Sequence, residues 1–253
     1  AATPISRVTT LRVYATTATA PLLHDLTTAY HQQHPEIVFE LATGSFQAMA
    51  DRILTDEDAY FFSHHLPDDI DSPDSRYWAA PLGQDALVIV VHSDNPITGV
   101  SVPEVRRLYE GRRPRWGLPD FDPPLRVLTG SDGSGLRAEF EALVLGGSPT
   151  IPGAQIAPNS QAMAELVARE PGAIGYVSLS RIGADLRVVP IDGVLPSADT
   201  VYDRTYPLRT LLYVVGRAEP LDDAQAMRAF IGWIQSPEGQ AVVGQRYAPL
   251  LRP

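Results

Sequence analysis

The sequence contains no cysteine and no lysine. Without cysteine, the chain has no disulfide, no thiolate metal ligand and no cysteine nucleophile, and cysteine usage cannot indicate its redox compartment. All 20 basic residues are arginine, and 30 acidic residues bring the formal net charge to −10. Nucleic acid is therefore not expected as a partner, because proteins bind phosphate backbones through basic surfaces.

Long apolar runs are also missing. No stretch approaches the roughly 18 to 20 apolar residues that cross a bilayer, and the opening AATPISR lacks the basic and then apolar pattern of a signal peptide. The 253 residues, 44% of them hydrophobic, suffice for one or two domains with their own cores. We therefore expect a chain that is at most peripheral to a membrane and, if exported, has lost its leader.

Strand-like and helix-like segments alternate along the chain, which is typical of α/β architecture with largely parallel sheets. Residues 86–91 form a continuous apolar run rich in β-branched residues, which predicts a strand covered on both faces. We place a first crossing between lobes just before this run and a return linker within 194–205. The predicted domains are lobe I, residues 1–83 plus 200–253, and lobe II, residues 84–199.

Three turns share one arrangement, in which a strand ends, a short run of Gly, Ser or Thr follows, and a helix begins. A helix N-terminus leaves backbone N–H groups unpaired and carries partial positive charge, so such turns bind anions without basic side chains. One Ser or Thr before a helix is usually only an N-cap, but turns at the carboxyl ends of parallel strands face a common crevice. The candidate ligand-binding residues are Thr16, Thr17, Ala18, Ser45, Phe46, Ser131, Ser134, Gly135 and Leu136.

Several motifs, in order over nearly the whole chain, resemble those of the phosphate-binding family of solute-binding proteins. Residues 15–22, ATTATAPL, are similar to that family's Gly-Ser-Thr-Thr-Val-Ala-Pro-Leu, and residues 133–137 with Phe140 are similar to its Gly-Ser-Gly-Thr-Arg with Phe. Residues 173–176 match its Ala-Ile-Gly-Tyr, and residues 105–116 resemble its segment of Leu, Phe or Tyr, Gly and Trp. The stretches 206–208, 236–240 and 248–250 continue the parallel.

The resemblance implies a type II periplasmic-binding-protein fold, with two α/β lobes joined by two crossing segments that close on a ligand. It implies a monomeric, extracytoplasmic subunit of an ABC importer. This subunit would be located in the periplasm or anchored at the cell surface, with a leader that is not present in this chain. This subunit would capture phosphate or a related oxyanion between its lobes and deliver it to a permease, without catalysis, cofactor or metal.

Carried over residue by residue, the resemblance assigns contacts to all three turns. Thr17 and the Ala18 amide would act from the first turn, and Ser45 from the second. The third turn would contribute Ser134, Gly135 and Leu136.

Three positions depart from the family. Gly130 stands where phosphate binders often have arginine, and Leu136 where they favour a hydroxyl. His64 stands where some of them use an aspartate to accept the proton of hydrogen phosphate, a role for which Asp132 is an alternative. A histidine can donate to phosphate or to sulfate, so a binding or sensor module for another oxyanion or a small carboxylate, without a transport role, is the alternative function.

An enzyme and a metal site are the remaining interpretations. Ser134 with Asp132 and a histidine would form a hydrolase set, but Gly133-Ser134-Gly135 does not fit the G-x-S-x-G elbow, and all six histidines precede residue 93. His64 and His65 follow each other at a strand end, so their side chains should point to opposite faces and not share a metal. A hydrolase is thus the less favoured alternative, and no metal site is predicted.

Overall fold

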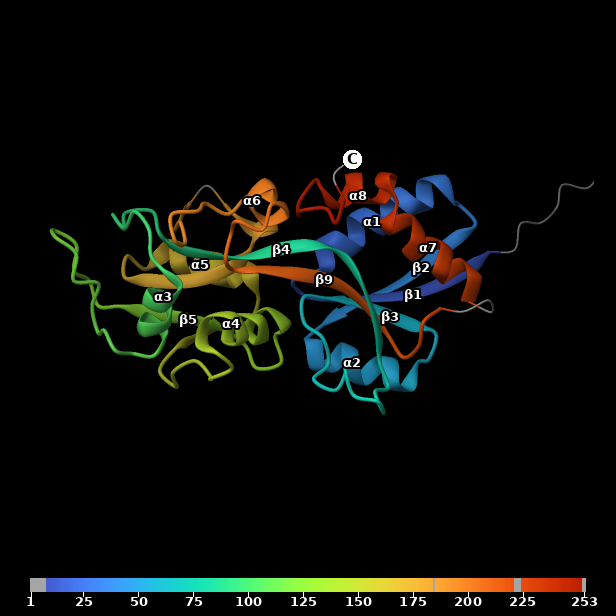
Figure 1. Cartoon of the computed structure of the whole chain (residues 1–253), viewed down its shortest axis with the longest axis horizontal. Coiled ribbons are helices and arrows are strands. Elements are labelled where there is room, and N and C mark those ends of the chain that lie inside the picture. The colour runs from blue at the N-terminus through green and yellow to red at the C-terminus, as the bar shows by residue number, and fades with distance from the viewer. Residues whose placement is uncertain (1–7, 184, 221–223, 252–253) are drawn as a thin grey trace, which may run out of the picture. The chain divides into compact units, whose positions relative to one another are not determined.

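The structure is a computed structural model that describes residues 8–183, 185–220 and 224–251. They form a mixed α/β fold, which confirms the predicted fold class (Figure 1). The chain divides into two compact units, of which unit 1 comprises Ala1–Gly83, Leu212–Gln245 and Pro249–Pro253. Unit 2 comprises Gln84–Leu211 and Arg246–Ala248.

Unit 1 is built on the strand order β2-β1-β3-β9. β1 (Thr9–Thr16) runs parallel to β2 (Ile37–Gly44) and to β3 (Ala59–Ser63), and β9 (Arg209–Gly216) is antiparallel to β3. The chain moves outward from β1 to β2 and then back past β1 to β3, so right-handed crossovers place the connecting helices on opposite faces. Accordingly, α2 (Phe46–Thr55) covers one face, whereas α1 (Ala20–Gln33), α7 (Gln225–Gln235) and α8 (Pro237–Val243) cover the other (Figure 1).

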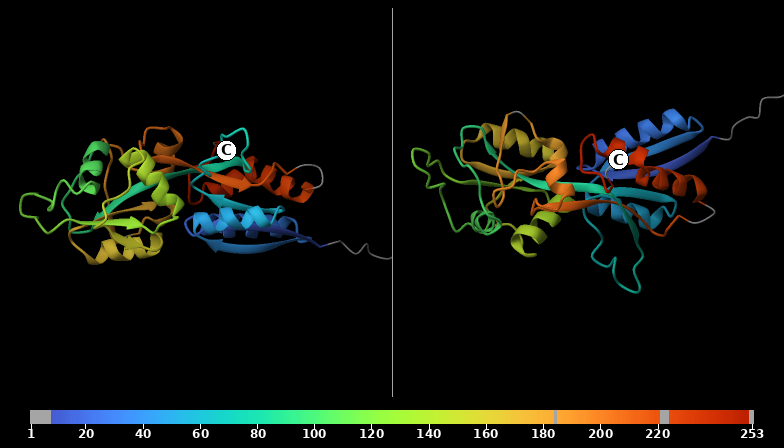
Figure 2. Two further views of the ribbon diagram at one scale, coloured as in Figure 1. Left: turned by 90° about the horizontal axis from the view of Figure 1, so that it is seen from below. Right: turned by 45° about the horizontal axis from the view of Figure 1, so that its top comes forward.

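Unit 2 is built on the order β4-β7-β5-β6, with β8 (Leu186–Val188) also paired to β4 (Trp78–His92). β5 (Arg126–Gly130) lies between its parallel neighbours β6 (Gln155–Ala157) and β7 (Ala173–Ser178). The connections again move outward and back, so α4 (Gly135–Leu145) and α5 (Ser160–Arg169) lie on opposite faces, as the right panel of Figure 2 shows. α3 (Val102–Tyr109) packs beside α4, and the short helix η1 (Leu179–Arg181) follows β7.

The second boundary between the units differs from the predicted one. Residues 200–211 belong to unit 2, whereas they were expected in lobe I. The expected linker at 194–205 contains α6 (Ala198–Tyr202), whose Val201 is fully buried. Tyr206 is buried as well and donates its hydroxyl to Leu87 O at 2.9 Å. Packing on the core of unit 2 therefore holds this segment.

Two details of unit 2 bear on its stability. α5 packs on β7 at Gly175, where a Cβ would lie 2.7 Å from Met163 Sδ and 2.9 Å from Val167 Cγ2. Asp85 is fully buried and accepts hydrogen bonds from the Ala86 N–H at 2.7 Å, the Leu179 N–H at 3.0 Å and the Ser178 hydroxyl at 2.6 Å. In the described part of the chain, no helix is long and apolar enough to cross a membrane.

Candidate functional site

The carboxyl ends of β1, β2 and β3 lie side by side in unit 1. Thr16 is in register with Gly44, and Ala15 with Phe62. α1 and α2 leave this edge toward opposite faces, which makes it a topological switch point, the place where open α/β sheets bind ligands. The first and second turns and His64 are thus brought to one edge of unit 1.

The hydroxyl groups of the first turn serve the fold. Thr19 donates to Phe62 O at 2.7 Å, and Thr16 Oγ1 lies 2.9 Å from Thr19 Oγ1. Thr17 directs both its N–H, at 2.9 Å, and its hydroxyl, at 3.2 Å, to Gly44 O. The Ala18 N–H has no acceptor among the described residues, so it is the donor that this turn leaves for a ligand. Thr19 was missed in the sequence because its acceptor comes from a different strand.

The second turn begins α2. Ser45 is the N-cap, and its Oγ accepts the Ala48 N–H at 3.2 Å, which leaves the hydroxyl proton for another acceptor. The Phe46 N–H has no acceptor within the described part of the chain. The Phe46 ring packs against Phe61 and His65, with centroids 5.8 and 5.0 Å away. Phe46 therefore offers its backbone rather than its side chain.

His64 and His65 differ in exposure. His64 follows β3 and is 1% exposed, whereas the side chain of His65 is 23% exposed and lies 3.8 Å from Asp68. The His65 N–H donates to Ser63 Oγ at 2.9 Å. His64 thus lies inside unit 1 at the edge that carries the two turns. Among the described residues, no group of three or more His, Asp or Glu side chains is arranged to hold a metal ion.

The third turn lies at the corresponding edge of unit 2, where β5 and β6 send their helices to opposite faces. Ser134 is the N-cap of α4, with its Oγ 3.4 Å from the Arg137 N–H, and the Ser134 N–H donates to Ser131 O at 3.1 Å. The N–H groups of Gly135 and Leu136 have no acceptor in the residues that the structure describes. The Leu136 side chain is 5% exposed and belongs to the hydrophobic core, so only its backbone can reach a ligand.

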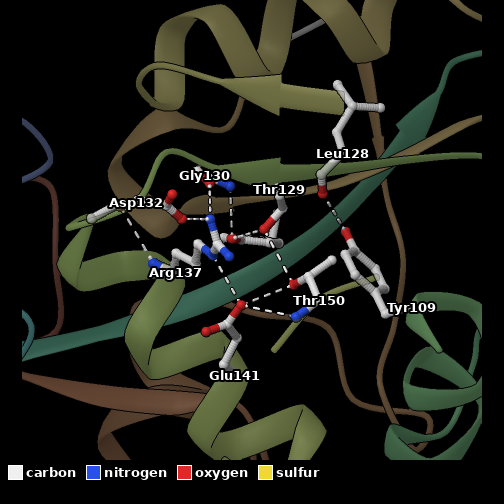
Figure 3. Close-up of polar contacts among 10 residues, drawn as sticks. Tyr109, Leu128, Thr129, Gly130, Asp132, Arg137, Glu141 and Thr150 are labelled. Carbon is white, nitrogen blue, oxygen red and sulfur yellow. Dashed lines mark hydrogen bonds and ion pairs between the residues drawn. The ribbon is translucent and has the colours of Figure 1, made fainter. Parts of the chain in front are cut away.

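Arg137, which was not among the expected ligand-binding residues, contacts the third turn at Gly130 and Asp132 (Figure 3). Arg137 forms ion pairs with Asp132 and, at 2.9 Å, with Glu141 Oε1. Burial alone would lower the pKa of Arg137, but the hydrogen bond and charge of Glu141 outweigh it and raise that pKa. Burial would likewise raise the pKa of Glu141, yet the Thr150 N–H and Arg137 bring it below its usual value. Asp132, the alternative proton acceptor, is thus engaged by Arg137.

The two edges offer the same chemistry. Their remaining donors are backbone N–H groups at helix N-termini and serine hydroxyls, which are neutral and suit a compact anion. The donors are the N–H groups of Ala18, Phe46, Gly135 and Leu136 and the hydroxyls of Ser45 and Ser134.

Known proteins resemble this chain over most of its length. A family model described as a PBP superfamily domain matches residues 1–238. The phosphate-binding protein PstS of Bacillus subtilis is 27% identical over 65% of this chain and 55% of its own, and PstS of Pseudomonas aeruginosa is 29% identical over 68% and 60%. A crystal structure from Clostridium perfringens, described as a phosphate ABC transporter substrate-binding protein with bound phosphate, has a TM-score of 0.86 at 21% identity and covers 96% of this chain and 100% of its own.

The similarities cover different shares of the matched proteins. The chain spans just over half the length of the curated relatives that it matches. The similarity to the solved structure shows the type II periplasmic-binding-protein fold. Because the family model covers all but the last 15 of the 253 residues, the chain belongs to the PBP superfamily.

Proposed function

We propose that the protein is the extracytoplasmic solute-binding subunit of an ABC importer, which captures phosphate or a related oxyanion and delivers it to a permease. The observation that carries the proposal is the pair of strand-end edges, one in each unit, that present unpaired N–H groups and serine hydroxyls. Relatives named phosphate-binding protein support phosphate as the first ligand to test. These relatives are named as binding proteins, in line with binding rather than catalysis.

The number of available donors agrees with the affinity that such a subunit needs. Micromolar capture requires about −8 kcal/mol, and each hydrogen bond to a charged group contributes roughly 1.5–3 kcal/mol. About three to five such hydrogen bonds therefore reach this affinity, and the two edges offer six donors in total.

Calorimetric titration with phosphate, sulfate, molybdate and small carboxylates tests the proposal. One anion should bind tightly, and Ser134→Ala should weaken it roughly 10- to 100-fold by removing a hydroxyl donor to a charged ligand. The matched control is Ser197→Ala, which removes the N-cap hydroxyl of α6 in the same unit and should leave the affinity unchanged. Failure to bind any anion in the panel, or equal losses in the two variants, would refute the proposal.

Three departures favour a second candidate ligand class. Gly130 brings no guanidinium to the third turn, Leu136 brings no hydroxyl, and His64 replaces an acidic side chain. A small carboxylate or a fully ionised oxyanion therefore competes with phosphate as the cargo. Preferential binding of a carboxylate in the same titration would support a binding or sensor module for that ligand.

A further inference from the structure

Three sequence motifs meet in unit 2 through aromatic residues that have no part in the proposed ligand contacts. Phe140, in α4, stacks on Tyr176 of β7 with ring centroids 4.2 Å apart and planes at 6°. Tyr109, at the end of α3, packs on Phe140 with a centroid distance of 4.4 Å. All three rings are fully buried or nearly so. Segments far apart in the sequence thus form one aromatic cluster, whose hydroxyl groups reach β5.

The Tyr176 hydroxyl holds the end of β5. It accepts the Gly130 N–H at 2.9 Å and lies 3.0 Å from Thr129 Oγ1. Burial raises the pKa of Tyr176 to about 12, so the hydroxyl keeps its proton and can accept one hydrogen bond while donating another. The N–H of the residue that opens the third turn is therefore held by a buried, neutral side chain.

Arg137 holds the same residue from the other side (Figure 3). Its Nη1 donates to Gly130 O at 3.2 Å, while its Nε donates to Glu141 Oε1 at 2.9 Å. Glu141 Oε1 also accepts the Thr150 N–H at 3.0 Å, which fixes the carboxylate on which the guanidinium rests. Both backbone groups of Gly130 are thus bound by side chains of other elements.

Gly130 also lies directly against the proposed ligand contacts. A Cβ at this position would be 3.3 Å from Ser134 Oγ and 3.2 Å from Arg137 Cβ. A displacement of Gly130 would therefore pass to the Ser134 hydroxyl and to the first N–H groups of α4. Hydrogen bonds to an anion depend steeply on the distance and direction of their donors.

We propose that Arg137 and Tyr176 are positioning residues for ligand recognition, because they hold both backbone groups of Gly130 and so keep the donors of the third turn aimed at one anion. This inference rests on the proposed function, in which those donors bind the ligand. Neither residue needs to touch the anion. Arg137 in particular acts through Gly130 and not as a cation presented to the ligand.

Tyr176→Phe and Arg137→Lys test the proposal in the full chain. Tyr176→Phe keeps the stacked ring but removes the partner of the Gly130 N–H, and Arg137→Lys keeps the charge but cannot bridge Glu141 and Gly130 O in the same way. Each should weaken phosphate binding roughly ten-fold in calorimetry. The matched control is Tyr109→Phe, which removes a buried hydroxyl from the same cluster at Leu128 O, 3.0 Å away and two residues before Gly130.

Amide hydrogen exchange in the ligand-free protein gives a second measurement that needs no ligand. The N–H groups of Ser134 and Ala138, which donate to Ser131 O and to Ser134 O, should exchange faster in Tyr176→Phe and Arg137→Lys than in the wild type or in Tyr109→Phe. Equal affinity losses and equal exchange in Tyr109→Phe and Tyr176→Phe would overturn the proposal and leave a purely structural role. If the wild type binds no anion of the panel, the proposed function fails, and hydrogen exchange alone decides whether the two residues position the turn.

Discussion

The packing of α5 on β7 requires the absence of a side chain at Gly175. A Cβ there would lie 2.7 Å from Met163 Sδ and 2.9 Å from Val167 Cγ2, well inside the separation of about 3.5–4 Å at which non-bonded atoms attract. The flexible Met163 side chain can withdraw, whereas Val167 is β-branched and has essentially one rotamer in a helix. We therefore expect Gly175→Ala to lower the free energy of unfolding by about 1–3 kcal/mol.

Urea denaturation followed by tryptophan fluorescence measures this loss. Gly153→Ala is the matched control, because a Cβ at that position meets nothing within 4 Å, and it should change the free energy of unfolding by less than about 0.5 kcal/mol. Adding Val167→Ala to Gly175→Ala should cost less than the sum of the two single changes, since it removes the rigid Cγ2 methyl that the new Cβ would meet. Equal stability of the two glycine variants, or simple additivity of the pair, would refute the packing argument.

Three further changes follow from other contacts. The pKa of Glu141 lies below its usual value of 4.5, so the stability that its ionised form contributes is complete above pH 4.5 and is lost as the pH falls through the lowered pKa. Glu141→Gln should therefore make the free energy of unfolding depend less steeply on pH in the acid range. An unchanged pH dependence would contradict this. Asp85→Ala leaves buried donors without their acceptor and should cost about 3 kcal/mol or more, so an unchanged denaturation midpoint would be incompatible with its hydrogen bonds. Ser45→Ala should cost about 1 kcal/mol of stability as a lost N-cap and should also weaken phosphate binding in calorimetry; a loss of stability with full affinity would remove Ser45 from the site.

The elements with a clear hydrophobic period could be predicted from the sequence. The apolar run at 86–91 lies within β4, and the residues expected around the three turns do stand where strands end and helices begin. α5 and α6 were not predicted. α6 has only five residues, too few to show a period, and its Ser197 cap directly follows Pro196, in the stretch that was expected to be a linker.

The hydrogen-bond donors of the candidate site could be predicted from the sequence better than the residues that hold them in position. Hydroxyls at helix starts are visible in the sequence, but whether they remain available depends on acceptors from other strands. Thr17 is engaged by Gly44, a pairing that only the parallel register of β1 and β2 creates. Arg137 was noted only as part of a motif, because its partner Gly130 O is a backbone group that sequence patterns do not identify.

The hydrogen bonds that Tyr176 and Arg137 form with Gly130 also limit which substitutions related sequences can accept. Tyr109, Phe140 and Tyr176 form one aromatic cluster beside β5, and Arg137 donates a hydrogen bond to Gly130 O at the end of this strand. A substitution at one of these positions changes which residues fit at the other three. We therefore expect co-variation among these positions in sequences that share this architecture, although they come from three separate stretches of the chain.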